Sequence, residues 1–161
     1  MMLALVGEEP DAVSSTFSPI LHEEISDTVQ VQLKFPSGVR GHVFASWLHP
    51  FKEQKLVVIG DAGMMVFDDR AAWSEKLVHY PHKVTWANGA PTPAAADAVP
   101  IALPEAEPLK LECQHFIDCV AENKTPRTDG VEALRVLKVL LAADPGVANA
   151  AVSSRFPDVM V

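Results

Sequence analysis

The sequence has few cysteines, little positive charge and no long hydrophobic run, and each shortage excludes a class of protein. Its two cysteines, Cys113 and Cys119, lie six residues apart in a segment with helical periodicity. That spacing puts them on different faces of one helix, so they form neither a disulfide nor a metal pair, and two free thiols suit the reducing cytoplasm. Thirteen Lys and Arg against 21 Asp and Glu give a net charge of −8, which argues against a nucleic-acid partner. The apolar run 1–6 is too short to span a membrane or to act as a signal peptide.

The common catalytic and cofactor motifs are also missing. Gly60 and Gly63 do not make a Gly-x-Gly-x-x-Gly turn, and there is no P-loop, no Gly-x-Ser-x-Gly elbow and no pair of Cys-x-x-Cys motifs. His79 and His82 have a ligand-like spacing but no third ligand nearby, so we expect no metal site there. The run 68–70, Asp-Asp-Arg, is more typical of a polar turn than of a cation site. We therefore predict no catalytic, cofactor-binding or metal-ligating residue within these 161 residues.

Strand-like segments come first in the sequence and helix-like segments last. Val29 to Phe35 alternates apolar and polar residues, and a Pro-Ser-Gly turn returns the chain toward Trp47, which predicts a hairpin. Residues 1–6 are expected to end a helix, closed by Gly7. Further strands are expected at 12–21, 56–59, 64–67, 75–80 and 99–103, with a long loop at 81–100 that includes a short strand at 83–86. Helices are expected from Pro108 and from Asp129.

This order predicts an α+β fold, in which helices pack on one face of an open, largely antiparallel sheet. We expect one domain over residues 1–143 and an irregular tail over residues 144–161. The other face of the hairpin carries a mixed set of side chains, namely Gln30, Gln32, Lys34, Arg40, His42, Phe44 and Ser46. That face is either solvated or in contact with the same face of a second subunit.

The segment from Ser46 to Glu53 holds the best candidates for a binding site. It places Trp47, His49, Phe51 and Lys52 in one Pro-interrupted turn, where a turn that only reverses the chain would use Gly, Asn, Asp or Ser. A loop carried on a rigid sheet is a usual place for ligand contacts. In the alternative interpretation the two aromatic rings cap the edge of the core and the two polar side chains are solvated.

Several segments together resemble the C-terminal domain of the glucose–fructose oxidoreductase/inositol dehydrogenase (Gfo/Idh/MocA) family. The matching segments are Asp27-Thr28, Phe35-Pro36-Ser37-Gly38-Val39, Ser46-Trp47-Leu48-His49-Pro50-Phe51-Lys52-Glu53, Glu107-Pro108-Leu109, Glu112-Cys113, His115-Phe116, Thr128-Asp129-Gly130 and Val136-Leu137. Within the family, the sequence is most similar to nucleotide-sugar dehydrogenases that oxidise UDP-N-acetylglucosaminuronate-type substrates. The resemblance covers residues 1–143 and implies a dihydrodipicolinate-reductase-like C-terminal domain.

The resemblance also implies parts that these 161 residues lack. Family members carry a Rossmann domain that binds NAD or NADP, a Glu-Lys-Pro motif with a catalytic lysine, and a motif with a catalytic histidine. Glu75-Lys76 is followed by Leu77 rather than proline, and it falls in an expected strand. A helix end at residues 1–6 is what a truncation just after the histidine motif would leave.

Two hypotheses follow from the resemblance. In the first, the chain is the substrate-binding and oligomerising half of an NAD(P)-dependent sugar or UDP-sugar dehydrogenase that oxidises a CH–OH group, and it is inactive alone. Lys52 would then meet a carboxylate or pyrophosphate, Trp47 or Phe51 would stack on a ring, and His49 would donate a hydrogen bond. In the second, the chain is a non-catalytic dimeric binding or regulatory module derived from the same domain. An in-frame Rossmann segment in the DNA upstream of Met1 would favour the first hypothesis, and a stop codon with a ribosome site would favour the second.

Overall fold

The computed structural model describes residues 1–23, 25–144 and 146. The chain divides into two compact units. The first unit contains Met1–His49 and the segment from Phe116 onward, and the second contains Pro50–His115. The irregular tail expected over residues 144–161 lies almost wholly outside the described residues.

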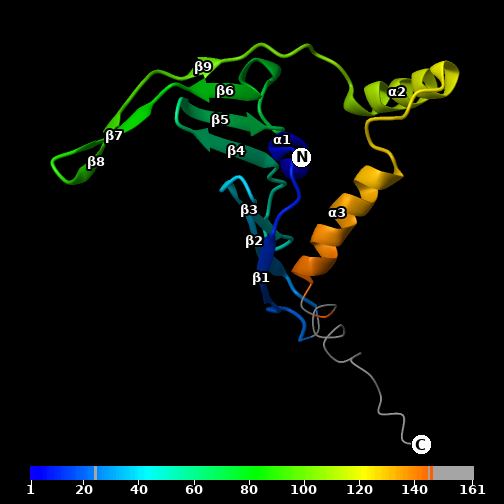
Figure 1. Ribbon diagram of the computed structural model, residues 1–161, viewed down its shortest axis with the longest axis horizontal. Coiled ribbons are helices and arrows are strands. Elements are labelled where there is room, and N and C mark those ends of the chain that lie inside the picture. The colour runs from blue at the N-terminus through cyan, green and yellow to red at the C-terminus, as the bar shows by residue number, and fades with distance from the viewer. Residues whose placement is uncertain (24, 145, 147–161) are drawn as a thin grey trace, which may run out of the picture. The chain divides into compact units, whose positions relative to one another are not determined.

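The first unit contains a three-stranded antiparallel sheet in the order β1-β2-β3 (Figure 1). The strands are β1 (Ala12–Ser18), β2 (Thr28–Lys34) and β3 (Arg40–Ser46). Their register places Ser14 opposite Gln32 and Gln32 opposite His42, so these polar side chains share one face. The predicted hairpin is therefore present, and Gly38 at φ 89° lies in its turn, a backbone region that glycine enters without steric cost.

Two helices cover the opposite face of this sheet. The buried residues of the cluster are Leu3 of α1 (Met2–Val6), Leu33 of β2 and Phe35, and Val139 of α3 (Gly130–Ala143) packs against them. The Ser15 hydroxyl donates a hydrogen bond of 2.5 Å to the carbonyl oxygen of Ala143, which fixes the end of α3 against β1. The predicted α+β class, with antiparallel strands and helices on one face, is confirmed.

Both helices end or begin as their sequences predict. Gly7 closes α1 in the left-handed conformation, at φ 76°. The Asp129 carboxylate caps α3 by accepting a 2.9 Å hydrogen bond from the backbone N–H of Glu132. The Glu132 carboxylate pairs with Arg135 at 2.6 Å, and Arg135 also reaches Glu9 at 3.4 Å, so α3 is tied to the segment that leads into β1.

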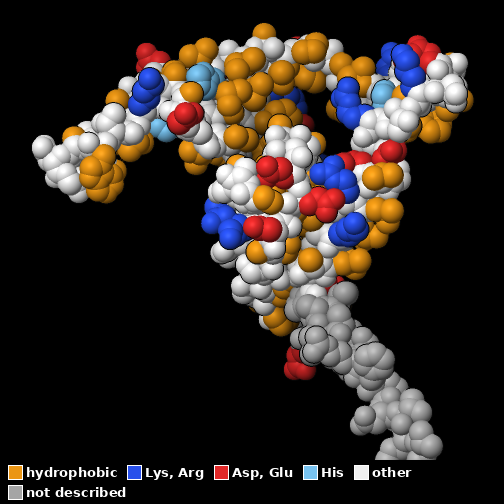
Figure 2. Space-filling view, in the orientation of Figure 1, with side chains coloured by type: hydrophobic (Ala, Val, Ile, Leu, Met, Phe, Trp, Pro, Cys, Tyr) orange, Lys and Arg blue, Asp and Glu red, His pale blue; other side chains and the backbone are white. Residues whose placement is uncertain are grey.

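The second unit contains a four-stranded antiparallel sheet in the order β4-β5-β6-β9. Its strands are β4 (Lys55–Gly60), β5 (Gly63–Asp68), β6 (Leu77–Tyr80) and β9 (Val99–Pro100), and the short 3₁₀ turn η1 (Trp73–Glu75) precedes β6. Hydrophobic side chains lie exposed on this unit and along α3 (Figure 2). The exposed hydrophobic residues of β4 are Val57, Val58 and Ile59. The strands of the described residues thus form three separate sheets, where the sequence indicated one.

A second, smaller sheet of this unit was not foreseen in full. Strands β7 (Lys83–Ala87) and β8 (Ala90–Ala94) form a hairpin where a long loop with one short strand was expected. Asn88 at φ 54° and Gly89 at φ 74° make the two-residue turn that such hairpins favour. Pro91 and Pro93 suggested a loop, but their register positions turn the missing N–H away from β7, so an edge strand tolerates both.

The helix α2 (Pro108–Glu122) begins at the predicted proline. Its expected apolar stripe is exposed in the structure, with Phe116 at 61% and Val120 at 68%, whereas Cys119 is buried. Both cysteines are free. Among the described helices, none is long and apolar enough to cross a membrane.

Candidate functional site

The predicted binding loop, Ser46 to Glu53, links β3 to β4 and crosses the boundary between the two units. Trp47 and His49 belong to the first unit, and Phe51 and Lys52 belong to the second. The loop begins with a short polar turn, in which the backbone N–H of Leu48 donates to the Ser46 hydroxyl at 3.1 Å.

Trp47 is attached to the first unit by its indole nitrogen. Its Nε1–H donates a 2.6 Å hydrogen bond to Oδ1 of Asp27, while 66% of the residue stays exposed. Thr28 pairs with Ser46 in the sheet, so Asp27 and Trp47 are the next residues along the two strands. The alternation of a strand puts them on the face that carries Val29 and Ala45, the covered face.

Asp27 is the partner of Trp47 that the sequence analysis did not single out. It is 4% exposed, and its Oδ2 accepts hydrogen bonds from the backbone N–H groups of Ile20 at 2.6 Å and Leu21 at 2.7 Å. The hydrogen bond from Leu21, then those from Trp47 and Ile20, hold the pKa of Asp27 below its ordinary value of 3.8, although burial acts in the opposite direction. The carboxylate is therefore ionised at neutral pH. A signal was present in the sequence, because Asp27-Thr28 is part of the family resemblance.

His49 lies beside the opposite, outer face of the same sheet. Its ring centroid is 5.7 Å from that of Phe44, with the two planes tilted by 39°. Phe44 is 51% exposed and projects from β3 on the face that also carries Gln30. His49 and Trp47 are therefore held by different parts of the first unit, the one by an aromatic contact and the other by a buried carboxylate.

Phe51 and Lys52 lie in the short segment before β4. Phe51 is 64% exposed, and Lys52 is also exposed. A solvent-exposed lysine is a flexible point charge that can follow an anionic group. The substrate role of these four residues stays a prediction.

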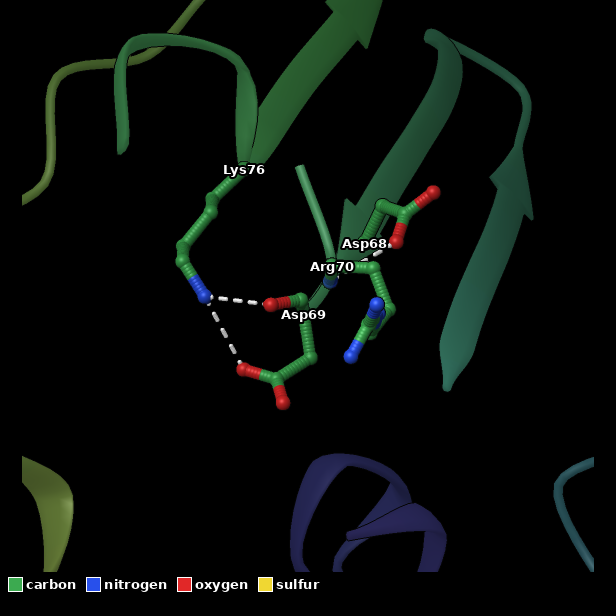
Figure 3. Close-up of polar contacts among 4 residues, drawn as sticks. All are labelled: Asp68, Asp69, Arg70 and Lys76. Carbon is green, nitrogen blue, oxygen red and sulfur yellow. Dashed lines mark hydrogen bonds and ion pairs between the residues drawn. The ribbon is translucent and has the colours of Figure 1, made fainter. Parts of the chain in front are cut away.

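The acidic turn of the second unit is already neutralised by lysines (Figure 3). Lys76 Nζ donates to the Asp69 carbonyl oxygen at 2.6 Å and to Asp69 Oδ1 at 3.0 Å, and it lies 5.0 Å from the centre of the Trp73 ring. The Asp68 carboxylate accepts a hydrogen bond from the backbone N–H of Arg70 at 3.0 Å and pairs with Lys55 at 3.3 Å. The hydrogen bond from Arg70 comes first among the causes that lower the pKa of Asp68. Both carboxylates of this turn are therefore held by ion pairs with lysines.

The two histidines around Tyr80 are also placed by local contacts. The Nδ1 atom of His82 lies 3.1 Å from the Tyr80 carbonyl oxygen, and Nε2 of His79 lies close to Gly63. Within the described part of the chain, no three His, Cys, Asp or Glu side chains come together in a way that would hold a metal ion.

One end of the β1-β2-β3 sheet carries a groove of about 520 Å³. Lys34 and Arg40 line it and lie directly opposite each other in the register, with Gln32 and His42 in the next row. The strand residues of the outer face include no Asp or Glu, so Lys34 and Arg40 face each other without an intervening carboxylate. Phe44 lies two rows further along the strands.

Comparison with known proteins shows which family model and which solved structures this chain is similar to. Residues 1–66, from α1 through most of β5, match the family model of the GFO/IDH/MocA C-terminal domain. This match confirms the family resemblance. A comparison with curated protein sequences gives no match.

Solved structures support the same fold over most of the chain. An oxidoreductase described as putative from Magnetospirillum magnetotacticum is 26% identical, with a TM-score of 0.67, and the alignment covers 89% of this chain and 44% of that one. The UDP-N-acetylglucosamine 3-dehydrogenase of Acidithiobacillus ferrooxidans is 19% identical, with a TM-score of 0.67, over 88% of this chain and 43% of that one. The aldose–aldose oxidoreductase of Caulobacter crescentus is 22% identical, with a TM-score of 0.62, over 96% and 42%. The chain thus spans less than half of the length of these three proteins.

The residues present here do not fit a dinucleotide. A dinucleotide-binding turn leads from a strand into a helix, whose N-terminus faces the pyrophosphate. The turn from Gly60 to Gly63 instead joins two antiparallel strands, β4 and β5. One of the similar structures is described as an NAD-binding protein, from Listeria innocua, and the alignment covers 42% of that chain.

Proposed function

We propose that this chain supplies the substrate-binding and oligomerising part of an NAD(P)-dependent dehydrogenase that acts on a sugar or a nucleotide sugar. The observation that carries the proposal is the family match over residues 1–66, together with a fold shared with sugar-nucleotide and aldose oxidoreductases over about two fifths of their length. The dinucleotide would be bound by a Rossmann domain, which this chain does not contain. We accordingly expect no binding of NAD or NADP when the isolated chain is titrated with either. The two free thiols favour the cytoplasm as its location.

The binding loop would contribute three kinds of contact to the substrate. Lys52 would pair with a carboxylate or pyrophosphate, and a charge-assisted hydrogen bond of this kind contributes roughly 1.5–3 kcal/mol. Trp47 or Phe51 would stack on a ring of the substrate. His49 would donate a hydrogen bond from its position beside Phe44.

The outer face of β1-β2-β3 is the surface that we assign to self-association. Phe44 is half exposed there, next to uncharged Gln30 and Thr16, which suits the apolar centre of an interface. A twofold axis near Phe44 would keep the Lys34 and Arg40 pairs of the two copies apart, because they lie at the other end of the face. Phe44→Glu should therefore shift the chain toward monomer in sedimentation equilibrium. A wild-type chain that is already monomeric, or a variant with unchanged mass, would contradict the assignment.

Direct binding tests the substrate role. The chain is titrated with UDP-N-acetylglucosamine, and its binding is followed by NMR, which detects weak complexes. Lys52→Ala should raise the dissociation constant about ten- to a hundredfold, corresponding to roughly 1.5–3 kcal/mol. Lys83→Ala, at an exposed lysine of the β7–β8 hairpin, is the matched control and should leave it within about twofold.

The upstream DNA separates the two hypotheses about the whole protein. An in-frame Rossmann segment with a catalytic-histidine motif before Met1 would support the dehydrogenase. A non-catalytic dimeric module is supported instead by a stop codon and ribosome site there, or by a chain that self-associates without binding the sugar nucleotide.

A further inference from the structure

The side chain of Trp47 combines an exposed ring with an anchored nitrogen. Nε1 is the one polar atom of an indole, and here it donates to Asp27 Oδ1 at 2.6 Å although the residue is 66% exposed. Most of the residue is therefore exposed, while a hydrogen bond to an ionised group fixes the position of the ring nitrogen. Such a bond is shorter and stronger than a neutral one.

The anchor is itself fixed in place. Asp27 is 4% exposed, its Oδ2 accepts the backbone N–H groups of Ile20 and Leu21, and its own N–H donates to the Ser18 carbonyl oxygen at 3.0 Å. These contacts hold the carboxylate at the ends of β1 and β2. The indole is thus tied to the sheet and not to the loop in which it lies.

The two oxygens of Asp27 serve two different partners. Oδ2 closes the turn after β1, and that turn is formed by residues that are themselves exposed, Ile20 at 61% and Leu21 at 75%. Oδ1 is directed to Trp47. A carboxylate that only closed the turn would not need its second oxygen directed at an exposed ring.

We propose that Asp27 is a positioning residue that presents the face of the Trp47 ring to the apolar face of a sugar or a nucleobase. The inference rests on the proposed function and assigns Trp47, rather than Phe51, as the stacking residue. Because the indole N–H is already bound, Trp47 recognises its ligand through the ring face alone. The contact therefore selects a flat apolar surface and adds no hydrogen-bond specificity.

Anchoring is tested without any ligand, by the indole N–H signals of the ¹⁵N-labelled 161-residue chain. The chain has three tryptophans, so Trp73 and Trp86 serve as internal controls. In Asp27→Asn the Trp47 signal should shift strongly and exchange faster with water, while the other two stay in place. Asp61→Asn, at the exposed turn between β4 and β5, is the matched control and should move none of them. An unshifted Trp47 signal in Asp27→Asn would overturn the anchor.

Presentation of the ring to a ligand is tested by titration with UDP-N-acetylglucosamine and, separately, with N-acetylglucosamine and UMP, which distinguish a sugar from a base as the stacked group. Trp47→Phe keeps an aromatic ring but removes the indole N–H. Asp27→Asn keeps the indole N–H of Trp47 but removes the negative charge of its partner. Each should weaken binding about threefold to tenfold, and the double variant should be no weaker than the weaker single variant, because both break the same contact. Binding that is unchanged in Asp27→Asn, or losses that multiply in the double variant, would overturn the positioning role.

The two proposals fail in different ways. A wild-type chain that shows the anchored indole signal but binds neither sugar nor nucleotide contradicts the proposed function and the ligand assigned here. A chain that binds UDP-N-acetylglucosamine with a freely exchanging Trp47 signal supports the proposed function and contradicts the role of Asp27.

Discussion

Replacing Phe35 by alanine should remove the centre of the first unit's core. Phe35 is 1% exposed and packs with Leu3 and Leu33. A Cβ atom placed on Gly41 would lie 3.6 Å from the Phe35 ring and 3.1 Å from the Met2 sulfur, so the ring is enclosed by α1 on one side and β3 on the other. The three elements α1, β2 and β3 would have to move to fill the space left by the ring.

The expected cost follows from that enclosure. Replacing a buried phenylalanine by alanine costs about 3–5 kcal/mol of unfolding free energy. The upper end of this range applies where the surrounding residues cannot collapse into the cavity. Domains are stable by only about 5–15 kcal/mol, so Phe35→Ala should remove roughly a fifth of the free energy of unfolding or more. At roughly 2–4 °C per kcal/mol for a chain of this size, the melting temperature should fall by roughly 6–20 °C.

Thermal and urea unfolding followed by circular dichroism measure this change, with Phe44→Ala as the matched control. Phe44 is 51% exposed on the other face of the same sheet, so its truncation should change the unfolding free energy of the monomer by only about 0.5 kcal/mol. Equal losses in the two variants would mean that Phe35 does not organise the core, and the packing of α1 against the sheet would have to be abandoned.

Three further predictions concern the turns and caps. Gly63→Ala should destabilise the second unit by at least roughly 1–3 kcal/mol in urea unfolding, because φ is 139° and a Cβ would lie 2.4 Å from the Tyr80 carbonyl oxygen; Gly60→Ala, where nothing lies within 4 Å, is its control. Asp129→Ala should cost about 1 kcal/mol by loss of the α3 cap, whereas Asp129→Ser should recover most of it, and a cost near zero would contradict the capping role. Since the pKa of Asp27 is lowered in the folded chain, its stabilising effect is present above pH 3.8 and is lost as the pH falls through the lower folded value; Asp27→Asn should lack this acid-dependent loss, and parallel acid-unfolding curves would refute it.

The elements of the fold could be predicted where one local pattern decides the structure. Alternation of apolar and polar residues fixed β2 and β3, Gly7 marked the end of α1, and Asp129 marked the start of α3. The β7–β8 hairpin was not predicted, because Pro91 and Pro93 are typical of a loop. Their register in the sheet places both prolines where the strand makes no backbone N–H hydrogen bond to β7, so the strand tolerates them. The exposure of the apolar stripe of α2 was not predicted, because helical periodicity indicates which residues share a face but not what covers that face.

The candidate site was predictable as a set of residue types but not as a set of contacts. The sequence singled out four residues of the loop because a turn that only reverses the chain favours Gly, Pro, Asn, Asp or Ser. These four are Trp47, His49, Phe51 and Lys52. The partner of Trp47 could not be found in this way, because Asp27 is 20 residues away and aspartates are mostly exposed in folded proteins. The sheet register brings the two together, and the register is a tertiary property.

The alternation of β3 separates the two roles that we assign to the first unit. Phe44 projects from the outer face, and Trp47, three residues later, lies at the end of the covered face with Asp27. Self-association and ligand stacking should therefore be independent. Phe44→Glu should lower the mass in sedimentation and leave the Trp47 indole N–H signal in place, whereas Trp47→Phe should weaken binding of UDP-N-acetylglucosamine and leave the mass unchanged. In the double variant the two effects should add, since side chains on opposite faces of a sheet share no partner. A loss of ligand affinity in Phe44→Glu would mean that association builds the binding site, and His49, whose ring contacts Phe44, would then be the residue that links them.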